Sequence, residues 1–266
     1  MLNASIVLYK QSPCEIKQLV ETLKKSQNVS TVFLIDNSPA QNSEFEKLEA
    51  EYIFNGKNLG YGTAHNIGLR KTIEQHVPYH LVVNPDISFQ ADILRKIENF
   101  MNKNPEISLL MPKILYPNGE IQYLCKLLPE PFDLIFRRFL PVRWTKKKMD
   151  KFELRASGYD KIIDVPYLSG CFMFLRTKAL LDTGLFDERF FMYPEDIDLT
   201  RRLHRQYRTV FYPAAEVIHN HARESYKNRN LLCIHITNMI KYFNKWGWIF
   251  DKERKGVNKK ILKQFE

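Results

Sequence analysis

The first third of the chain alternates short apolar runs with amphipathic stretches. Runs rich in β-branched and aromatic residues predict strands at residues 5–9, 31–35, 52–54 and 79–83. Between the first two runs, a proline at position 13 followed by apolar residues at helical spacing predicts a helix that reaches about residue 26. Strands that alternate with helices in this way are typical of a parallel sheet with helices on its faces.

Polar turns follow the second and fourth of these strands. The second strand runs into Asp36-Asn37-Ser38, and the fourth runs into Asn84-Pro85-Asp86. A glycine-rich segment, residues 58–68, leads into the helix between the third and fourth strands. Because ligands of open α/β sheets bind at the carboxyl ends of the strands, we expect a binding site at this edge.

The remainder of the chain is less regular. Further strands are expected at residues 107–111, 165–168, 171–175 and 210–212, and a hairpin over 114–124 is expected to turn at Asn118-Gly119. A helix is predicted to begin near Glu195, and the chain from residue 223 is expected to be helical with one apolar stripe. Residues 132–152 form a basic amphipathic insert that Pro141 interrupts.

The composition excludes several classes of protein. The 266 residues are 44% hydrophobic, which is enough for a folded core, and no repeat is visible. The four cysteines lie far apart and predict reduced thiols in the cytosol rather than a disulfide framework or a zinc finger. No apolar run approaches the roughly 18 residues of a membrane span, so we expect a chain that is neither secreted nor integral to a membrane.

The net charge of +10 favours a polyanionic partner. The excess of positive charge lies in the 132–152 insert and in residues 241–266. The latter segment contains eight basic residues, three acidic residues and several aromatic residues. This composition fits helices on an anionic membrane surface, or helices that pack on the domain with a solvated basic face. A nucleic-acid partner is not expected, because the basic residues form no continuous groove.

Five residues have side chains suited to catalysis or metal binding. Asp86, just past a buried strand, could bind a divalent cation or simply cap the next helix. Glu195 and Asp196 begin a helix behind an apolar stretch, which suits a general base but also a favourable interaction with the helix dipole. His219 and His221 follow a strand-like segment and could complete a metal site or lie in a surface loop.

The glycine-rich segment matches neither phosphate-binding fingerprint. The spacing of Asn58, Gly60, Gly62, Asn66 and Gly68 is not GxGxxG, and no GxxxxGK[ST] loop is present. Its glycines would still permit a nucleotide or sugar to approach the backbone closely, or allow tight packing of a helix.

Taken together, these segments resemble family 2 glycosyltransferases of the GT-A fold, in particular their rhamnosyltransferase-like branch. The matching segments are IDNS, NLGYGTAHNIG, VVNPD, LSGCFMFLRTKAL, GLFDERFFMYPEDIDLTRRL and IHNH. The resemblance implies an α/β fold with a mostly parallel central sheet and helices on both faces. It assigns residues 1–222 to a catalytic domain, with a nucleotide-sugar half at 1–112 and an acceptor half at 113–222. Residues 223–266 would form an amphipathic helix and basic tail.

The resemblance also implies a metal-dependent transfer with inversion at the anomeric carbon. Donor-binding residues would be Tyr9, Asp36, Asn58, Gly60, Gly62, Asn66 and Asn84. Asp86 would be the remaining carboxylate of the DXD element, with Mg or Mn as its cation, and His219 or His221 would add a ligand. Asn84 stands where that element has its first Asp. The catalytic base would be Asp196, with Glu195 as the alternative.

The best expectation for the reaction is transfer of rhamnose from dTDP-rhamnose to a polyprenyl-diphosphate-linked glycan in bacterial surface polysaccharide synthesis, as O-antigen or capsule. Such an enzyme would be cytoplasmic and peripheral at the inner face of the membrane. The alternatives are a UDP-hexose, galactofuranosyl or N-acetylhexosaminyl transferase of the same fold, and, from other classes, a non-catalytic nucleotide-sugar or nucleic-acid binding protein. The sequence leaves the oligomeric state open.

Overall fold

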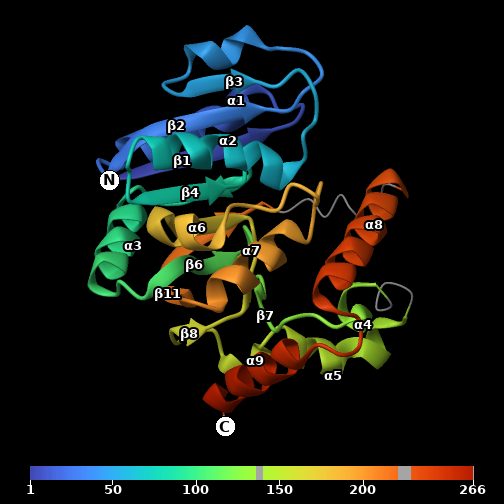
Figure 1. The fold of residues 1–266 in the computed structure, drawn as a ribbon. Coiled ribbons are helices and arrows are strands. Elements are labelled where there is room, and N and C mark those ends of the chain that lie inside the picture. Colours follow the sequence, from blue (N-terminus) through green and yellow to red (C-terminus); the bar gives the residue numbers. More distant parts are fainter. Residues whose placement is uncertain (136–139, 221–228, 266) are drawn as a thin grey trace.

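A single mixed sheet forms the centre of the molecule, which is a computed structural model describing residues 1–135, 140–220 and 229–265 (Figure 1). The nine strands of this sheet include two of only two residues. They are β1 (Leu2–Leu8), β2 (Val29–Asp36), β3 (Glu51–Phe54), β4 (Tyr79–Val83), β5 (Ile87–Ser88), β6 (Ile107–Leu115), β8 (Ile163–Asp164), β10 (Phe172–Arg176) and β11 (Arg208–His219).

The strand order is β3-β2-β1-β4-β10-β6-β11-β5, with β8 paired to β11. The four strands from β3 to β4 are parallel, and β10 enters between β4 and β6 antiparallel to both. β11 runs parallel to β6, whereas β5 and β8 are antiparallel to β11. The expected α/β fold with a mostly parallel sheet is therefore confirmed, with antiparallel strands inserted in its second half.

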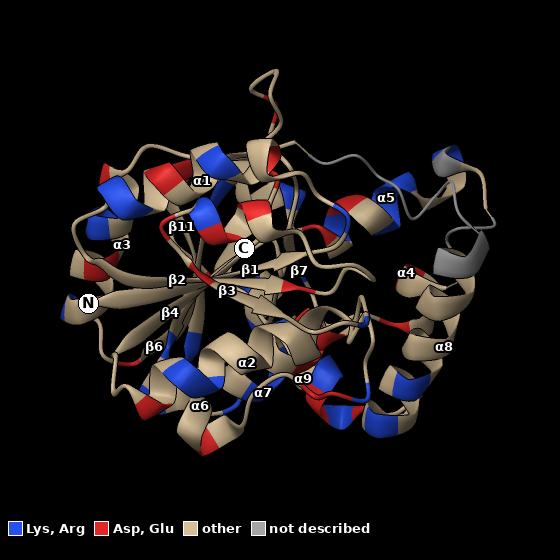
Figure 2. Cartoon of the chain, turned by 90° about the horizontal axis from the view of Figure 1, so that it is seen from above, with Lys and Arg blue, Asp and Glu red and all other residues tan. Residues whose placement is uncertain are grey.

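Helices cover both faces of the sheet (Figure 2). α1 (Pro13–Lys25) and α3 (Asp92–Lys103) lie on one face, and α2 (Tyr61–Glu74), α6 (Thr177–Thr183) and α7 (Glu195–His204) lie on the other. α1 buries the stripe Ile16, Leu19, Val20 and Leu23 at the spacing that its sequence predicts. The core is continuous from β1 to β11.

The structure also describes four α-helices and a second, two-stranded sheet outside the central sheet and the helices on its faces. β7 (Cys125–Lys126) and β9 (Tyr167–Leu168) pair antiparallel. The predicted insert contains α4 (Pro131–Leu134) and α5 (Val142–Phe152), and residues 136–139, with their basic and aromatic side chains, lie outside the described residues. The expected continuous C-terminal helix is instead two helices, α8 (Arg229–Trp246) and α9 (Lys252–Leu262), with a turn between them.

Two other expectations differ from the structure. Within the predicted strand over 165–168, only Tyr167–Leu168 forms a strand, β9, which pairs with β7 in the small sheet, whereas β8 lies just before this range and pairs with β11. The predicted strand at 210–212 and the strand-like residues 215–218 are parts of one long strand, β11, with an irregular register between Tyr212 and Glu216.

All four cysteines are free. Within the part of the chain that the structure describes, no helix is long and apolar enough to cross a bilayer.

A chain of buried polar side chains holds α2 against the sheet. The Ser5 hydroxyl of β1 lies 2.7 Å from Nδ1 of His65 in α2 and 2.7 Å from Nε2 of His80 in β4. Thr72 of α2 lies 2.7 Å from the other ring nitrogen of His80. Burial lowers the pKa of both histidines, that of His80 to about 3, so both rings are neutral. The helix that begins at the candidate site is therefore fixed by specific bonds as well as by apolar packing.

Candidate active site

The end of β2 is built around Asp36, which is fully buried. Its carboxylate accepts a hydrogen bond from the backbone N–H of Ser38 at 2.8 Å and from the hydroxyl of Tyr52 at 2.7 Å. Tyr9, at the end of β1, is 45% exposed, and the next residue, Lys10, donates its backbone N–H to the Ser38 hydroxyl. Asp36 therefore sets the shape of the turn beside Tyr9, and its contact with a nucleotide base remains a prediction.

Asn37 connects three strand and helix ends, and sequence reasoning missed its role. Its amide nitrogen donates to the carbonyl of Gly60 at 3.1 Å, and its Oδ1 accepts from Asn55 at 2.9 Å. Oδ1 of Asn58 accepts from the backbone N–H of Gly60 at 2.9 Å. The polar turn after β2 thus holds the segment that precedes α2. The signal in the sequence was the position of Asn37 directly after a buried strand.

The glycines at the start of α2 allow close contact with a distant loop. Gly60 has φ +85°, and a Cβ there would lie 2.3 Å from the carbonyl oxygen of Phe191. A Cβ on Gly62 would lie 2.9 Å from Cβ of Phe186. The backbone N–H of Tyr61 donates to the same Phe191 carbonyl at 2.9 Å. Residues 184–194 therefore pack directly against the N-terminus of α2.

Residues 58–68 were expected to lead into the helix, but most of them lie inside it, because α2 begins at Tyr61. Asn66 lies inside the helix and is buried, with its amide bonded to both backbone groups of Phe186 at 2.9 and 3.0 Å. Gly68 also lies in the helix, where a Cβ would approach Ser5 to 3.0 Å. Asn66 thus holds the 184–194 loop, and only residues 58–60 remain as the connection before the helix.

Tyr61 joins this region to the turn after β4. Its hydroxyl oxygen lies 2.9 Å from Oδ1 of Asn84 and 2.7 Å from the carbonyl oxygen of Gly170. The backbone N–H of Gly170 in turn donates to Oδ2 of Asp196 at 3.0 Å. Burial, followed by the nearby charges of Cys171 and the acidic side chains, raises the pKa of Tyr61 well above its ordinary value. The hydroxyl is therefore neutral and lies among the predicted site residues.

The acid pair begins α7, as predicted, and both side chains are buried. Asp196 accepts from the backbone N–H groups of Gly170 and Ile197. Oε2 of Glu195 is buried and has no hydrogen-bond partner among the described residues. Burial raises the pKa of Asp196 to about 6, and burial together with the charge of Asp196 raises that of Glu195 well above its ordinary value. Two backbone N–H groups stabilise the ionised form of Asp196, whereas Oε2 of Glu195 has no partner among the described residues, so these contacts favour Asp196 as the member that ionises first.

Asp86 meets His219 because β5 pairs antiparallel with the end of β11. Oδ1 of Asp86 lies 3.3 Å from Nε2 of His219, and both atoms are buried. Gln122 orients the ring, since its Oε1 lies 2.9 Å from Nδ1 of His219 and its amide nitrogen donates to the His219 carbonyl at 2.7 Å. Sequence reasoning did not find Gln122. His221 lies outside the described residues.

This pair of atoms fits a divalent cation. Burial opposes a charge on His219, yet bonds to Asp86 and Cys171 raise its pKa to about 10, so a bound cation would have to replace the proton of Nε2. No group of three or more His, Cys, Asp or Glu side chains within the described residues is arranged to hold a metal ion. Mg²⁺ is commonly bound by one or two carboxylates while substrate phosphates complete its coordination. Asp86 supplies one such carboxylate, and the imidazole of His219 lies beside it.

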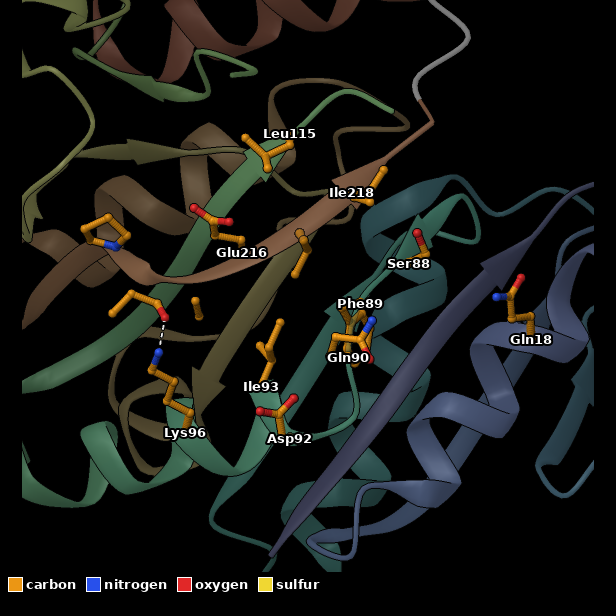
Figure 3. Close-up of a pocket in the computed structure, with 14 residues that line it drawn as sticks. Gln18, Ser88, Phe89, Gln90, Asp92, Ile93, Lys96, Leu115, Glu216 and Ile218 are labelled. Carbon is orange, nitrogen blue, oxygen red and sulfur yellow. Dashed lines mark hydrogen bonds between the residues drawn. The ribbon is translucent and has the colours of Figure 1, made fainter. Parts of the chain in front are cut away.

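An open groove lies beside this site rather than in it (Figure 3). It has a volume of about 590 Å³ and is lined by α3 and β11, including Asp92, Lys96 and Glu216. Lys96 reaches the backbone carbonyl of Ala214 across it. None of the predicted site residues lines the groove. Gly60, Gly62 and Asn66 lie instead where the 184–194 loop packs on α2. Asp86 and His219 lie where β5 meets the end of β11.

Comparisons of sequence relate the chain to named transferases. It is 25% identical over 238 residues to the N-acetylglucosaminyl-diphospho-decaprenol L-rhamnosyltransferase of Mycobacterium tuberculosis, covering 85% of this chain and 78% of that protein. It is 28% identical over 213 residues to rhamnosyltransferase WbbL of Escherichia coli, covering 77% and 78%. A hexosyltransferase of Haloferax volcanii, Agl10, is 26% identical over 212 residues, covering 77% and 62%. No model of a protein family matches the chain.

Solved structures share the fold. GalNAc-T7 with UDP, GalNAc and Mn²⁺ matches with a TM-score of 0.63 at 13% identity, over 92% of this chain and about half, 48%, of that one. Residues 1–349 of TarS from S. aureus match with a TM-score of 0.58 at 15% identity, covering 99% and 70%. A mannosyltransferase of Pyrobaculum calidifontis in complex with GDP-Man and Mn²⁺ gives 0.55 at 12% identity, covering 99% and 74%. The architecture of the sheet and its helices is that of the GT-A transferases.

Proposed function

We propose that this chain, a GT-A-fold glycosyltransferase related to rhamnosyltransferases, transfers rhamnose from dTDP-rhamnose to a hydroxyl of a polyprenyl-diphosphate-linked glycan. The observation that carries the proposal is the buried acid pair beside Tyr61, Asn84 and Gly170. The names of the two rhamnosyltransferase relatives support the donor sugar, and the decaprenol-linked substrate in one of those names supports a lipid-linked acceptor. The product would serve bacterial surface polysaccharide, as O-antigen or capsule.

Asp196 is the proposed catalytic base. A base must be ionised to accept the acceptor's hydroxyl proton, and a pKa of about 6 makes Asp196 mostly ionised at neutral pH while it remains basic. Burial and the charge of Asp196 raise the pKa of Glu195 well above its ordinary value, so Glu195 is less suited to that role. A base on the face of the sugar opposite to the leaving diphosphate gives inversion in one displacement. The two backbone N–H bonds to Asp196 keep its carboxylate in place.

The proposed donor site lies along the strand ends. Tyr9 and Asp36 would receive the base of the nucleotide, while Asn58, Gly60 and Gly62 would allow its diphosphate and sugar to approach the backbone. Asn84 is held toward the site by the Tyr61 hydroxyl. Asn66 would contribute by fixing the 184–194 loop, since its amide is already bonded to Phe186.

Asp86 and His219 would hold Mg²⁺ or Mn²⁺, with His221 as a further proposed ligand. When bound, the cation would neutralise the charge that develops on the leaving diphosphate. Gln122 keeps the imidazole in an orientation that directs Nε2 toward Asp86. We assign this reaction to residues 1–222 and the support of the site to residues 223–266.

A lipid-linked acceptor would place the enzyme at the cytoplasmic face of the cell membrane as a peripheral protein. The positive charge of the chain is consistent with an anionic membrane surface. Nucleic acid is not part of the proposal, because the site at the strand ends carries acidic side chains.

A UDP-hexose or galactofuranosyl donor is the second candidate. The similarity to a hexosyltransferase favours it. Thermal unfolding with dTDP, UDP, GDP and CMP, each with and without Mn²⁺, distinguishes the two, since a ligand that binds only the native state raises the melting temperature. We expect the largest metal-dependent shift with dTDP. A preference for UDP would favour the second candidate, and no shift with any nucleotide would contradict a nucleotide-sugar transferase.

A further inference from the structure

The turn between α8 and α9 presents three consecutive apolar side chains to solvent. Trp248 is 37% exposed, Ile249 is 69% exposed and Phe250 is 90% exposed. We call residues 248–250 the apolar tip. Single exposed apolar residues are common on proteins, but a large aromatic side chain nine-tenths exposed beside two further apolar residues is typical of an interaction surface.

The backbone of the apolar tip is rigid because a buried arginine binds it from beneath. The guanidinium of Arg254 donates to the carbonyls of Gly247, Trp248 and Ile249 at 3.4, 3.0 and 3.4 Å, and to that of Pro129 at 3.2 Å. Asp251 caps α9 by accepting the backbone N–H of Arg254 at 2.9 Å. With its carbonyls bonded inward, the turn directs the Ile249 and Phe250 side chains outward. This shape is therefore set before any partner binds.

Basic residues lie beside the apolar tip. Lys252 and Lys255 of α9 are exposed and follow it directly in the chain. α5 adds exposed Arg143, and Trp144 beside it is 68% exposed. The segment from Pro129 onward connects the two groups, since Arg254 binds Pro129 and Lys148 of α5 binds Glu130. In Figure 1, α4, α5, α9 and the lower end of α8 gather at one end of the molecule.

The same part of the chain also supports the candidate site. Asn238 of α8 donates to the carbonyl of Met192 at 3.0 Å, in the loop that precedes the acid pair. Asp251, the residue after the apolar tip, forms a buried ion pair with Arg201 of α7 at 2.8 Å. The helix that begins with Glu195 is thus held by the residue next to Phe250. A partner that binds the apolar tip would be fixed in orientation relative to the site.

We propose that the apolar tip and the exposed basic residues of α5 and α9 form a docking surface for the interfacial region of an anionic lipid bilayer. Aromatic and aliphatic side chains enter the headgroup region while neighbouring lysines and arginines attract anionic lipids, and this surface has both. Docking there would hold the acid pair near the headgroups, where a lipid-linked acceptor presents its sugar. The inference rests on the proposed acceptor and names the surface that would reach it.

Sedimentation with vesicles of phosphatidylcholine alone, or mixed with phosphatidylglycerol, tests the surface with the whole chain. We expect binding to the anionic vesicles that weakens with salt, and a loss of at least about tenfold in the double variant Ile249→Ser/Phe250→Ser. The matched control is Leu181→Ser, since Leu181 is 66% exposed on α6. It should bind vesicles like the wild type.

Three results would overturn the proposal. These are wild-type protein that stays in the supernatant, a double variant that binds vesicles as well as the wild type does, and a wild-type dimer in light scattering that becomes a monomer in the double variant. The last would identify the partner as a second copy of the chain. The thermal shift with dTDP and Mn²⁺ is measured on the same samples. Vesicle binding without that shift would contradict the proposed function alone, and the shift without vesicle binding would contradict this inference alone.

Discussion

At the scale of single residues, the proposed reaction depends most on how protons are divided between Glu195 and Asp196. Asn in place of Asp196 cannot accept a proton, so Asp196→Asn should lower kcat by about 10²- to 10⁴-fold. Because burial and the charge of Asp196 raise the pKa of Glu195 well above its ordinary value, Glu195→Gln should lower kcat by less than about tenfold. Initial rates of nucleoside diphosphate release measure both. A larger loss in Glu195→Gln than in Asp196→Asn would reverse the assignment.

The distribution of protons between Glu195 and Asp196 also predicts how kcat/KM depends on pH. Burial raises the pKa of Asp196 to about 6, so the fraction of ionised base falls as the pH falls through that value. We expect kcat/KM to rise from pH 5 to pH 7 with an apparent pKa near 6 that belongs to the coupled pair. A profile of kcat/KM that is flat between pH 5 and pH 8 would show that neither carboxylate acts as the base.

Gln122 allows a test of the proposed metal site that does not depend on turnover. Gln122→Leu removes the acceptor for Nδ1 of His219 and should weaken Mn²⁺ binding by about 10- to 100-fold. Electron paramagnetic resonance of free Mn²⁺ in the presence of dTDP measures that affinity. Gln18→Leu is the control, because Gln18 is exposed on α1. Equal affinity of Gln122→Leu and the wild type for Mn²⁺ would show that Gln122 does not support the proposed metal site.

Residues such as Tyr61 and Gln122 were beyond sequence reasoning for a physical reason. The hydroxyl of Tyr61 bonds to the carbonyl of Gly170, and Gln122 bonds to His219, which lies 97 positions further along the chain. Such bonds depend on how β10 and β11 enter the sheet, which no local pattern specifies. By contrast, Asp36, Asp86 and Asp196 could be found because each follows a buried strand or begins a helix. Asn66 lies inside α2 rather than before it, because the helix begins earlier than the glycines indicate.

At the scale of elements, the contact between α2 and the 184–194 loop requires glycine at position 60. Gly60→Ala would place a methyl group 2.3 Å from the Phe191 carbonyl at φ +85°. Gly119 has a similar φ of +83° but open space around it, so Gly119→Ala isolates the backbone strain of about 1 kcal/mol. We expect Gly60→Ala to lower the free energy of unfolding in urea by at least about 2 kcal/mol more. Equal effects of the two variants would contradict the close packing.

The C-terminal helices are joined to α7 by a buried ion pair. Arg201 is 2% exposed, lies 2.8 Å from Asp251 and 2.6 Å from Glu253, and stacks on Trp246. Arg201→Met leaves the buried Asp251 with only the more distant guanidinium of Arg254, at 4.0 Å, and should cost about 3 to 5 kcal/mol in urea unfolding. Arg205→Ala breaks a half-exposed pair with Glu253 and should cost less than about 1 kcal/mol. Similar small losses in both variants would show that α7 does not depend on this contact.

The hydrophobic pattern predicted individual elements better than their connections. The strand Tyr79–Val83 and the helix from Pro13 agree closely with expectation, because each satisfies its own periodicity. The C-terminal stripe predicted one helix, but Gly247 and the capping residue Asp251 divide it. Met239 and Phe243 of that stripe are buried in the core, whereas Phe250 projects into solvent. Sequence alone did not distinguish an apolar residue that packs inward from one at an exposed turn.

At the scale of the whole molecule, the basic residues of the chain fall into two groups, those that bind the domain itself and those that remain exposed. Several basic residues of the C-terminal region bind the domain itself, among them Lys245, which pairs with Asp187 at 2.8 Å, and the buried Arg254. Others, on α5 and α9, remain exposed beside the apolar tip. The net charge of +10 therefore overstates what is available to an external partner, and the distribution of exposed charge is the better guide.

The central claim is that the buried acid pair performs sugar transfer from a nucleoside diphosphate donor. Its most direct test is release of dTDP from dTDP-rhamnose by purified protein with Mn²⁺ and a polyprenyl-diphosphate-linked N-acetylglucosamine acceptor, comparing wild type with Asp196→Asn. We predict acceptor-dependent release by the wild type and about 10²-fold less, or lower still, by the variant, which should still show the thermal shift with dTDP. Equal release by both proteins would contradict the claim.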